Sequence, residues 1–344
     1  MYRRFVFGTI GATIALSLAA LATTFVPAGH TRSAALVNDA MRVRTTAATT
    51  TSTNPVAQLT YQGGSVEKSP AIYVVYWGKW WSTPVVTGTN GAYSYTNQQA
   101  MAYIGAPGSK PGSTSTGFLT NVGGSPWSNV MNQYCQGAPL QSVACPSGTT
   151  HIANTSNEFH GAFIDSTNAI PVTPTMTDVA NEAAYAAGYA AKNLGYNPAT
   201  QDATFFVFTP STNSVAGYGT SWCATHGITS YNGGTNNLAF AYIPYEPAFG
   251  ATCGTNSVNA TSTKWNSFGN GYFDGFSITA GHEYAEAEVN PNPVAGSAAW
   301  LDYAGNETAD KCIWNPLSAN ISLGGKNYAV QPTWSNAAGA CVLK

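Results

Sequence analysis

The chain has 344 residues, and only 8% of them are charged, against about 25% in an average soluble domain. The formal net charge of −2 gives no electrostatic basis for binding nucleic acid or an anionic membrane surface. Hydrophobic residues make up 44% and aromatic residues 12% of the chain, which is ample material for a core. We interpret this composition as that of an exported protein that stays soluble through its Ser, Thr, Asn and Gly residues.

The first 28 residues have the pattern of a signal peptide. Arg3 and Arg4 precede an uncharged apolar run over residues 5–26, and Val26-Pro27-Ala28 offers small residues near a cleavage point. The run is also long enough to span a bilayer as an uncleaved anchor. The proline and the segment that follows favour cleavage, so we expect a secreted protein with no membrane attachment afterwards.

Residues 29–56 are rich in Thr and Ala and lack apolar periodicity. Such a segment buries too little apolar surface to order itself, so we predict a disordered linker or a propeptide. Residues 57–344 would then form the folded domain, which we expect to be monomeric.

Three continuous apolar runs in the domain predict buried strands, at residues 71–77, 203–209 and 238–243. The clearest helix covers residues 177–194, with Thr177 or Asp178 as its cap. Shorter helices are predicted at 97–104, 127–134 and 277–289. This order of elements predicts one α/β domain, of the α+β kind, with a mixed twisted sheet.

All six cysteines follow the predicted linker, and an even number in an exported chain indicates disulfides. The sequence alone does not decide between the possible pairings. Sequential pairing is the simplest, and it would join the following residues: Cys135 to Cys145, Cys223 to Cys253, and Cys312 to Cys341.

The most distinctive stretch of the domain is Gly281-His282-Glu283-Tyr284-Ala285-Glu286. His282 and Glu286 are four residues apart, so on a helix they share one face. Glu283 follows His282 as the general base does in H-E-x-x-H zinc hydrolases. We therefore predict a metalloprotease-like active-site helix, in which Glu286 stands where the second histidine normally does.

A second motif, Asn306-Glu307-Thr308-Ala309-Asp310, resembles the segment that supplies the third zinc ligand in gluzincin metallopeptidases. We predict His282, Glu286 and Glu307 as the metal ligands. Asp310, at a helical i+3 spacing from Glu307, is predicted to accept the second N–H of His282. The predicted metal is Zn²⁺, although a set with one histidine and two carboxylates would also suit Mn²⁺ or Ca²⁺.

Two further residues are candidates for catalysis beside Glu283. His226 would supply a second nitrogen ligand, or a hydrogen bond to an oxyanion, if its loop folds over the cleft. Tyr303 is another candidate for the oxyanion role. The alternatives are structural: the His-Glu segment as a surface turn with i,i+4 partners, and His226 as a hydrogen-bonded histidine next to a disulfide.

An ordered set of short motifs extends over most of the domain. The segments are Tyr61-Gln-Gly-Gly64, Ile72-Tyr-Val-Val-Tyr-Trp-Gly78, Cys223-Ala-Thr-His226, Gly281-His-Glu-Tyr-Ala-Glu286, Asn290-Pro291, Ala299-Trp300 and Glu307-Thr-Ala-Asp310 with Cys312. Together they resemble the motifs of the phosphate-induced protein 1, or EXORDIUM, family. The resemblance implies an extracellular protein, linked in plants to growth and cell expansion, without a settled biochemical activity. The low charge and the insert around residues 88–117 depart from the plant pattern and favour a bacterial relative.

Two readings of function follow. The first is a secreted zinc-dependent metallopeptidase-like hydrolase, with a peptide or protein substrate and a cleft open to solvent over His282. The second is a non-catalytic extracellular binding or signalling protein, with a cell-wall component as a partner. A glycosidase using Glu283 and Glu307 is disfavoured, because nothing in the sequence indicates a sugar-binding groove between two carboxyl groups.

Overall fold

The computed structural model describes residues 36–44, 58–111, 117–235, 237–262, 268 and 270–344. These residues belong to one compact unit, Ser33–Lys344. The predicted signal peptide, residues 1–28, lies outside the described residues. Among the helices that the structure describes, none combines the length and the apolar character needed to cross a bilayer.

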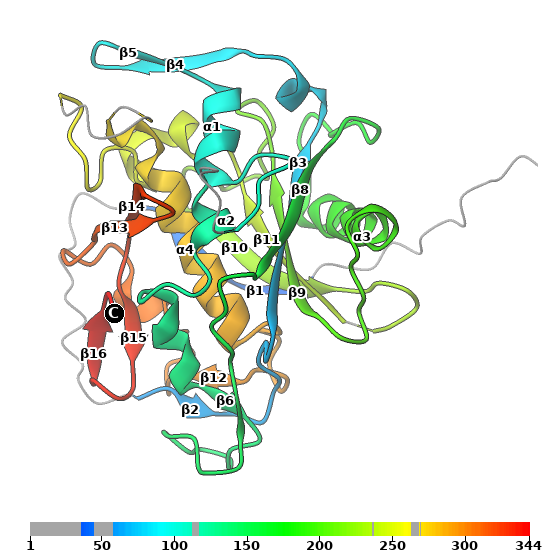
Figure 1. Cartoon of the computed structure of the whole chain (residues 1–344), viewed down its shortest axis with the longest axis vertical. Coiled ribbons are helices and arrows are strands. Elements are labelled where there is room, and N and C mark those ends of the chain that lie inside the picture. Colours follow the sequence, from blue (N-terminus) through cyan, green and yellow to red (C-terminus); the bar gives the residue numbers. More distant parts are fainter. Residues whose placement is uncertain (1–35, 45–57, 112–116, 236, 263–267, 269) are drawn as a thin grey trace, which may run out of the picture. The chain divides into compact units, whose positions relative to one another are not determined.

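A six-stranded mixed sheet forms the centre of the domain (Figure 1). Its strands, in spatial order, are β1 (Leu36–Arg42), β10 (Trp222–Thr229), β11 (Leu238–Ile243), β9 (Asp202–Phe208), β3 (Pro70–Trp77) and β8 (Phe159–Asp165). The four strands β11, β9, β3 and β8 run parallel to one another, whereas β10 is antiparallel to both β11 and β1. The predicted single α/β domain on a mixed twisted sheet is confirmed.

Two long helices cover the two faces of this sheet (Figure 1). Helix α3 (Met176–Asn193) packs on one face with Tyr73 and Val75 of β3, and helix α4 (Asp274–Val289) lies on the other face with Val74 and Tyr76. Neighbouring side chains of a strand point to opposite faces. Strand β3 is therefore apolar at every position, since both of its faces are buried.

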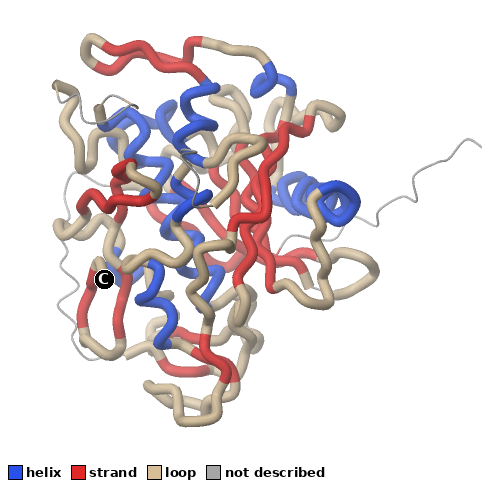
Figure 2. Tube along the Cα trace, in the orientation of Figure 1, coloured by secondary structure: helices blue, strands red, loops and turns tan. Residues whose placement is uncertain are grey.

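Helix α4 is unusual because all of its 16 residues are buried. The sheet covers one side, and smaller elements cover the side away from the sheet, among them β14 (Lys326–Val330) (Figure 2). A helix that is enclosed on every side has no solvent-facing stripe. Its histidine and glutamates must therefore find their partners inside the protein.

The remaining elements are short. The helices are α1 (Asn97–Ile104) and α2 (Phe118–Asn121), with 3-10 turns η1 (Lys79–Ser82), η2 (Ser128–Gln133), η3 (Glu246–Cys253), η4 (Gly271–Phe273) and η5 (Asp310–Cys312). The strand pairs are β2 (Thr60–Tyr61) with β12 (Trp300–Leu301), β4 (Val86–Asn90) with β5 (Tyr93–Thr96), β6 (Cys135–Gln136) with β7 (Thr150–His151), β13 (Ala319–Leu323) with β14, and β15 (Thr333–Ser335) with β16 (Ala340–Val342).

The three disulfides each join a cysteine to the next one along the chain, which is the simplest pairing considered from the sequence. They join Cys135 to Cys145, Cys223 to Cys253, and Cys312 to Cys341. The third ties the turn that begins at Asp310 to the C-terminal strand pair, so it braces a segment that lies against α4.

Two sequence predictions fail locally. Strand β1 lies inside the segment predicted to be disordered, because its backbone pairs with β10 and Met41 becomes buried. His226 lies on β10 rather than on a loop. The short helix predicted at 127–134 is present as the 3-10 helix η2, over Ser128–Gln133.

Candidate metal centre

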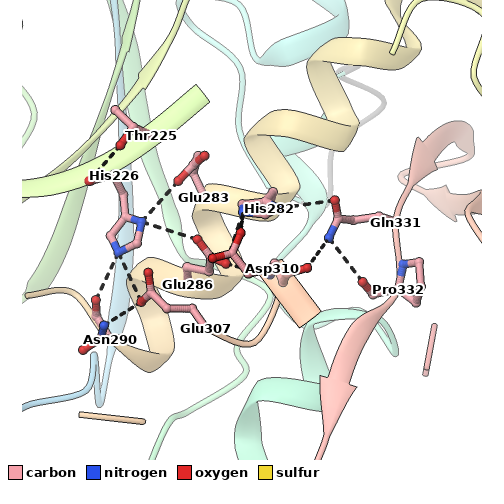
Figure 3. Close-up of polar contacts among 11 residues, drawn as sticks. Thr225, His226, His282, Glu283, Glu286, Asn290, Glu307, Asp310, Gln331 and Pro332 are labelled. Carbon is pink, nitrogen blue, oxygen red and sulfur yellow. Dashed lines mark hydrogen bonds and ion pairs between the residues drawn. The ribbon is translucent and has the colours of Figure 1, made fainter. Parts of the chain in front are cut away.

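The candidate centre gathers side chains from α4, from β10 and from the segment before η5 (Figure 3). Four carboxyl groups and two imidazoles meet there, and we call them the acid–histidine cluster: Glu283, Glu286, Glu307, Asp310, His226 and His282. Five of the six residues are at most 1% exposed, and the side chain of Asp310 is 15% exposed. The predictions of a surface turn and of an open cleft over His282 are therefore both wrong in this structure.

His282 is oriented by a residue that the sequence analysis did not single out. Its Nδ1 lies 3.3 Å from Oε1 of Gln331, which follows β14, and the amide nitrogen of Gln331 donates to the Ala309 carbonyl over 2.9 Å. That donation points the amide oxygen at the imidazole, so Nδ1 carries the proton. The other ring nitrogen, Nε2, then faces the carboxylates, where a bound metal would take the place of its proton.

The Nε2 atom of His282 faces two carboxylates. It lies 3.1 Å from Oε1 of Glu286 and 3.4 Å from Oδ1 of Asp310. The position of Glu286 follows from the i,i+4 spacing on α4, as predicted. Asp310 comes from η5, and its backbone N–H also donates to Glu286 Oε1 over 2.9 Å.

The structure places both Glu307 and Asp310 differently from the prediction. Asp310, rather than Glu307, lies beside His282 and Glu286, and Gln331 takes the place predicted for Asp310 on the other ring nitrogen. Residues 307–309 are not helical, and only the 3-10 turn η5 begins at residue 310. The two carboxylates therefore do not share one face of a helix, as their i+3 spacing had predicted.

His226 connects the remaining members of the cluster. Its Nε2 donates to the Asn290 carbonyl over 3.2 Å and lies 3.6 Å from Glu307 Oε1, which accepts the Asn290 amide at 2.5 Å. Its Nδ1 lies 3.2 Å from Glu283 Oε2 and 3.6 Å from Glu286 Oε2. His226 therefore contacts the predicted base directly, and Asn290 is a second residue whose role in the site was not predicted.

Burial dominates the electrostatics of the cluster. It raises the pKa of Glu283 to about 8 and that of Glu286 well above its usual range, although His282 lowers both. Burial also opposes the charged form of His282, but Glu286 and Asp310 outweigh it and hold the pKa of His282 well above its usual range. Burial thus favours the neutral form of these two carboxyl groups, whereas the neighbouring carboxylates favour the charged form of the imidazole.

The donor atoms of the cluster fit a cation. Within the part of the chain that the structure describes, His282 Nε2 and Glu283 Oε1 are buried and have no hydrogen-bond partner. The ion pairs of the cluster all join a histidine to a carboxylate, and the neighbouring Lys311 pairs with Asp302 instead. A divalent cation bound there would displace the proton from Nε2 of His282 and offset the negative charge of the carboxylates around it.

Ligand atoms converge in two overlapping groups that share Glu286. The first comprises His282, Glu286 and Asp310, and the second comprises His226, Glu283 and Glu286. In each group the ligand atoms lie within 4.8 Å of one another. A third group contains Cys223, Cys253 and Glu246, but its two cysteines form a disulfide and offer no thiolate.

Tyr303 is not part of the cluster. Its side chain is fully exposed, in the loop after β12. The neighbouring Asp302 accepts the backbone N–H groups of Ala304 and Asn306 over 2.9 Å each, so it shapes this turn. Of the predicted catalytic residues, the structure brings together Glu283 and His226 and leaves Tyr303 outside.

Comparisons of the chain with protein-family models, with curated proteins and with solved structures found no match. The resemblance to the EXORDIUM family therefore stays a prediction from the sequence motifs. The function has to be argued from the cluster itself.

Proposed function

We propose that this protein is a secreted metal-dependent hydrolase of the metallopeptidase kind, with His282, Glu286 and Asp310 as ligands of a divalent cation. The observation that carries the proposal is the convergence of their three ligand atoms within 4.8 Å. The Nε2 atom of His282 supports it, because it is buried and faces carboxylate oxygens of Glu286 and Asp310 at 3.1 Å and 3.4 Å. One imidazole with two carboxylates suits Zn²⁺, and Mn²⁺ or Ca²⁺ are the alternatives.

Each side chain then has a defined task. His282, Glu286 and Asp310 would hold the divalent cation, which when bound would supply a Lewis acid for a substrate carbonyl group. Glu283 stays outside the ligand group that contains His282 and acts as the general base for water. His226, 3.2 Å from Glu283 Oε2, orients that carboxyl group and shares its proton. Three disulfides and the N-terminal signal pattern support an extracellular location.

A second function is favoured by the burial of the cluster. With His226, His282 and Glu283 each 0% exposed, a cation held there could serve the fold alone. The protein would then be a non-catalytic extracellular binding or signalling protein of the EXORDIUM-like kind, with a cell-wall component as its partner. A measurement of metal binding does not distinguish between the two functions, because both allow a bound cation. A measurement of peptide hydrolysis does distinguish them.

The first test is the metal content of the purified secreted protein, measured by elemental mass spectrometry. About one zinc per chain is the stoichiometry of a single catalytic site, and we expect the His282→Ala variant to lose it. His151→Ala is the matched control, because His151 is exposed in β7 and lies outside the cluster. A wild-type protein that binds no zinc, manganese or calcium after dialysis against each would overturn the proposal.

A further inference from the structure

Strand β1 closes the candidate centre from the edge of the sheet. It pairs antiparallel with β10, the strand that carries His226, and the register puts Asp39 opposite His226 and Met41 opposite Ala224. Strand β1 also contacts helix α4, which carries Glu283. A segment that precedes the predicted domain therefore lies against both elements, β10 and α4, that supply most of the centre.

The contacts that hold residues 36–44 use mainly backbone groups. The N–H of Val43 donates to Ser221 O over 3.0 Å, and the N–H of Arg44 donates to Thr252 O over 2.7 Å. The carbonyl of Arg42 accepts the indole N–H of Trp314 over 2.8 Å. Any extended peptide offers the same groups, and this is how strand addition binds peptides with little dependence on sequence.

Two side chains of the segment add selectivity. Met41 is 0% exposed and belongs to the hydrophobic core cluster on the α4 side of the sheet. The guanidinium of Arg42 lies 5.6 Å from the centroid of the Trp222 ring, within the range of a cation–π contact. The position that β1 occupies beside β10 therefore accepts an extended peptide in which an apolar residue is followed by a cationic residue.

Without β1, the sheet would still be continuous from β10 to β8, and β10 would become its edge. The unpaired backbone groups of an edge strand are a template for another strand. The exposed edge would lie beside His226 and Glu283, which are both 0% exposed when β1 is in place.

We propose that β1 occupies the peptide-binding site of this protein, and that an extended peptide pairing antiparallel with β10 binds there once β1 has left. If the protein is the proposed hydrolase, the full-length chain is held inactive by its own N-terminal segment. This consequence rests on the proposed function. The expected ligand carries an unbranched apolar residue, in place of Met41, opposite Ala224.

The test uses the full chain with the recognition sequence of a site-specific protease inserted between residues 45 and 57. The same chain with an uncleavable version of that sequence is the control. After cutting, residues 36–44 are removed by washing, and a fluorescently labelled peptide of that sequence (LVNDAMRVR) is titrated back by anisotropy. We expect binding with a Kd on the order of micromolar to the cut chain and none to the control.

A second readout separates the inference from the proposed function. We expect the cut chain to hydrolyse a fluorogenic peptide library at least about tenfold faster than the control, with unchanged metal content. Peptide binding without any hydrolysis would leave the inference standing and defeat the hydrolase proposal. Measurable hydrolysis at equal rates by the cut and control chains, no peptide binding, or unfolding of the cut chain when residues 36–44 are removed would each overturn the inference.

A point variant tests the same idea in the uncut chain. Met41→Ala should loosen β1 and allow measurable binding of the labelled peptide. Met101→Ala is the matched control, because Met101 is also buried in the same core cluster but lies on α1. Equal peptide binding by both variants would mean that a general loss of stability, rather than release of β1, admits the peptide, and this too would overturn the inference.

Discussion

Helix α4 contributes to two buried clusters of carboxyl groups, and the two clusters differ in their partners. The acid–histidine cluster contains two imidazoles. The second cluster contains Glu288 of α4 with Glu67 and Glu158, and its partners are hydroxyl and amide groups. Tyr284 donates to Glu158 over 2.6 Å, and Thr204 donates to Glu67 over 2.6 Å.

The physical consequence is a difference in the ability to hold a cation. Burial raises the pKa of Glu67 and of Glu288 well above the usual range, and that of Glu158 to about 7. These acids are stable as neutral hydrogen-bonding groups. The acid–histidine cluster instead brings imidazole and carboxylate ligand atoms together within 4.8 Å, and among the described residues the second cluster forms no such group. The comparison teaches that burial alone does not indicate a metal site, whereas buried carboxylates with an oriented imidazole do.

The largest expected effect is on the rate of catalysis, and it should be seen for a variant of the acid–histidine cluster but not for one of the second cluster. Glu283→Gln should lower the rate of peptide hydrolysis by about 10² to 10⁴, because it removes the general base, while zinc stays bound. Glu288→Gln, on the same helix, should leave both the rate and the zinc content close to wild type. Steady-state kinetics and elemental analysis of both variants check this, with β1 removed if the uncut chain is inactive. A Glu283→Gln variant with wild-type activity would contradict the role of Glu283.

Removal of the metal should have the next largest effect. A ligand at a thousand times its Kd stabilises the folded state by about 4 kcal/mol, so treatment with a chelator should lower the melting temperature by about 10 °C. The His282→Ala variant should show no such shift, because it has no metal to lose. A chelator effect of the same size in both proteins would place the bound ion elsewhere.

The second cluster predicts how the stability of the metal-free protein depends on pH. Glu158 binds its proton more tightly in the folded state than in the unfolded state, so its contribution is fully present below about pH 4.3, the pKa of an unperturbed Glu. That contribution is lost as the pH rises through about 7, the folded pKa. The loss should amount to at most about 4 kcal/mol. Urea unfolding between pH 4 and 8 measures it, and Glu158→Gln should flatten that dependence.

A smaller effect is expected from Tyr284→Phe. The change deletes the hydroxyl that donates to Glu158 and leaves a buried acceptor without that partner, which costs about 1–3 kcal/mol. The zinc content should not change, although Tyr284 lies between His282 and Glu286 on the helix. Loss of zinc in this variant would show that the two clusters are not independent.

The smallest effect is expected at Tyr303, whose side chain is fully exposed. Tyr303→Ala should change the free energy of unfolding by less than about 0.5 kcal/mol and leave zinc content and hydrolysis unchanged. A marked loss of activity would restore the oxyanion role predicted from the sequence and require the loop after β12 to move when substrate binds.

The local parts of this protein follow from its sequence. Continuous apolar runs predicted β3, β9 and β11, and the spacing of His282 and Glu286 predicted that both would face the same partners. Sequential pairing of the cysteines is also a short-range property, with separations of 10, 30 and 29 residues. In each case the deciding interaction is set by the repeat of a helix or strand, or by a short loop.

The rest of the site was decided by tertiary structure alone. His226 meets Glu283 across 57 residues of sequence, and Gln331 meets His282 across 49. Asp310 replaces Glu307 beside the imidazole because the segment around them does not form a helix. Strand β1 becomes ordered only because β10 offers its edge. Such contacts depend on how the sheet, α4 and the C-terminal segments pack, and no local pattern of residues encodes that arrangement.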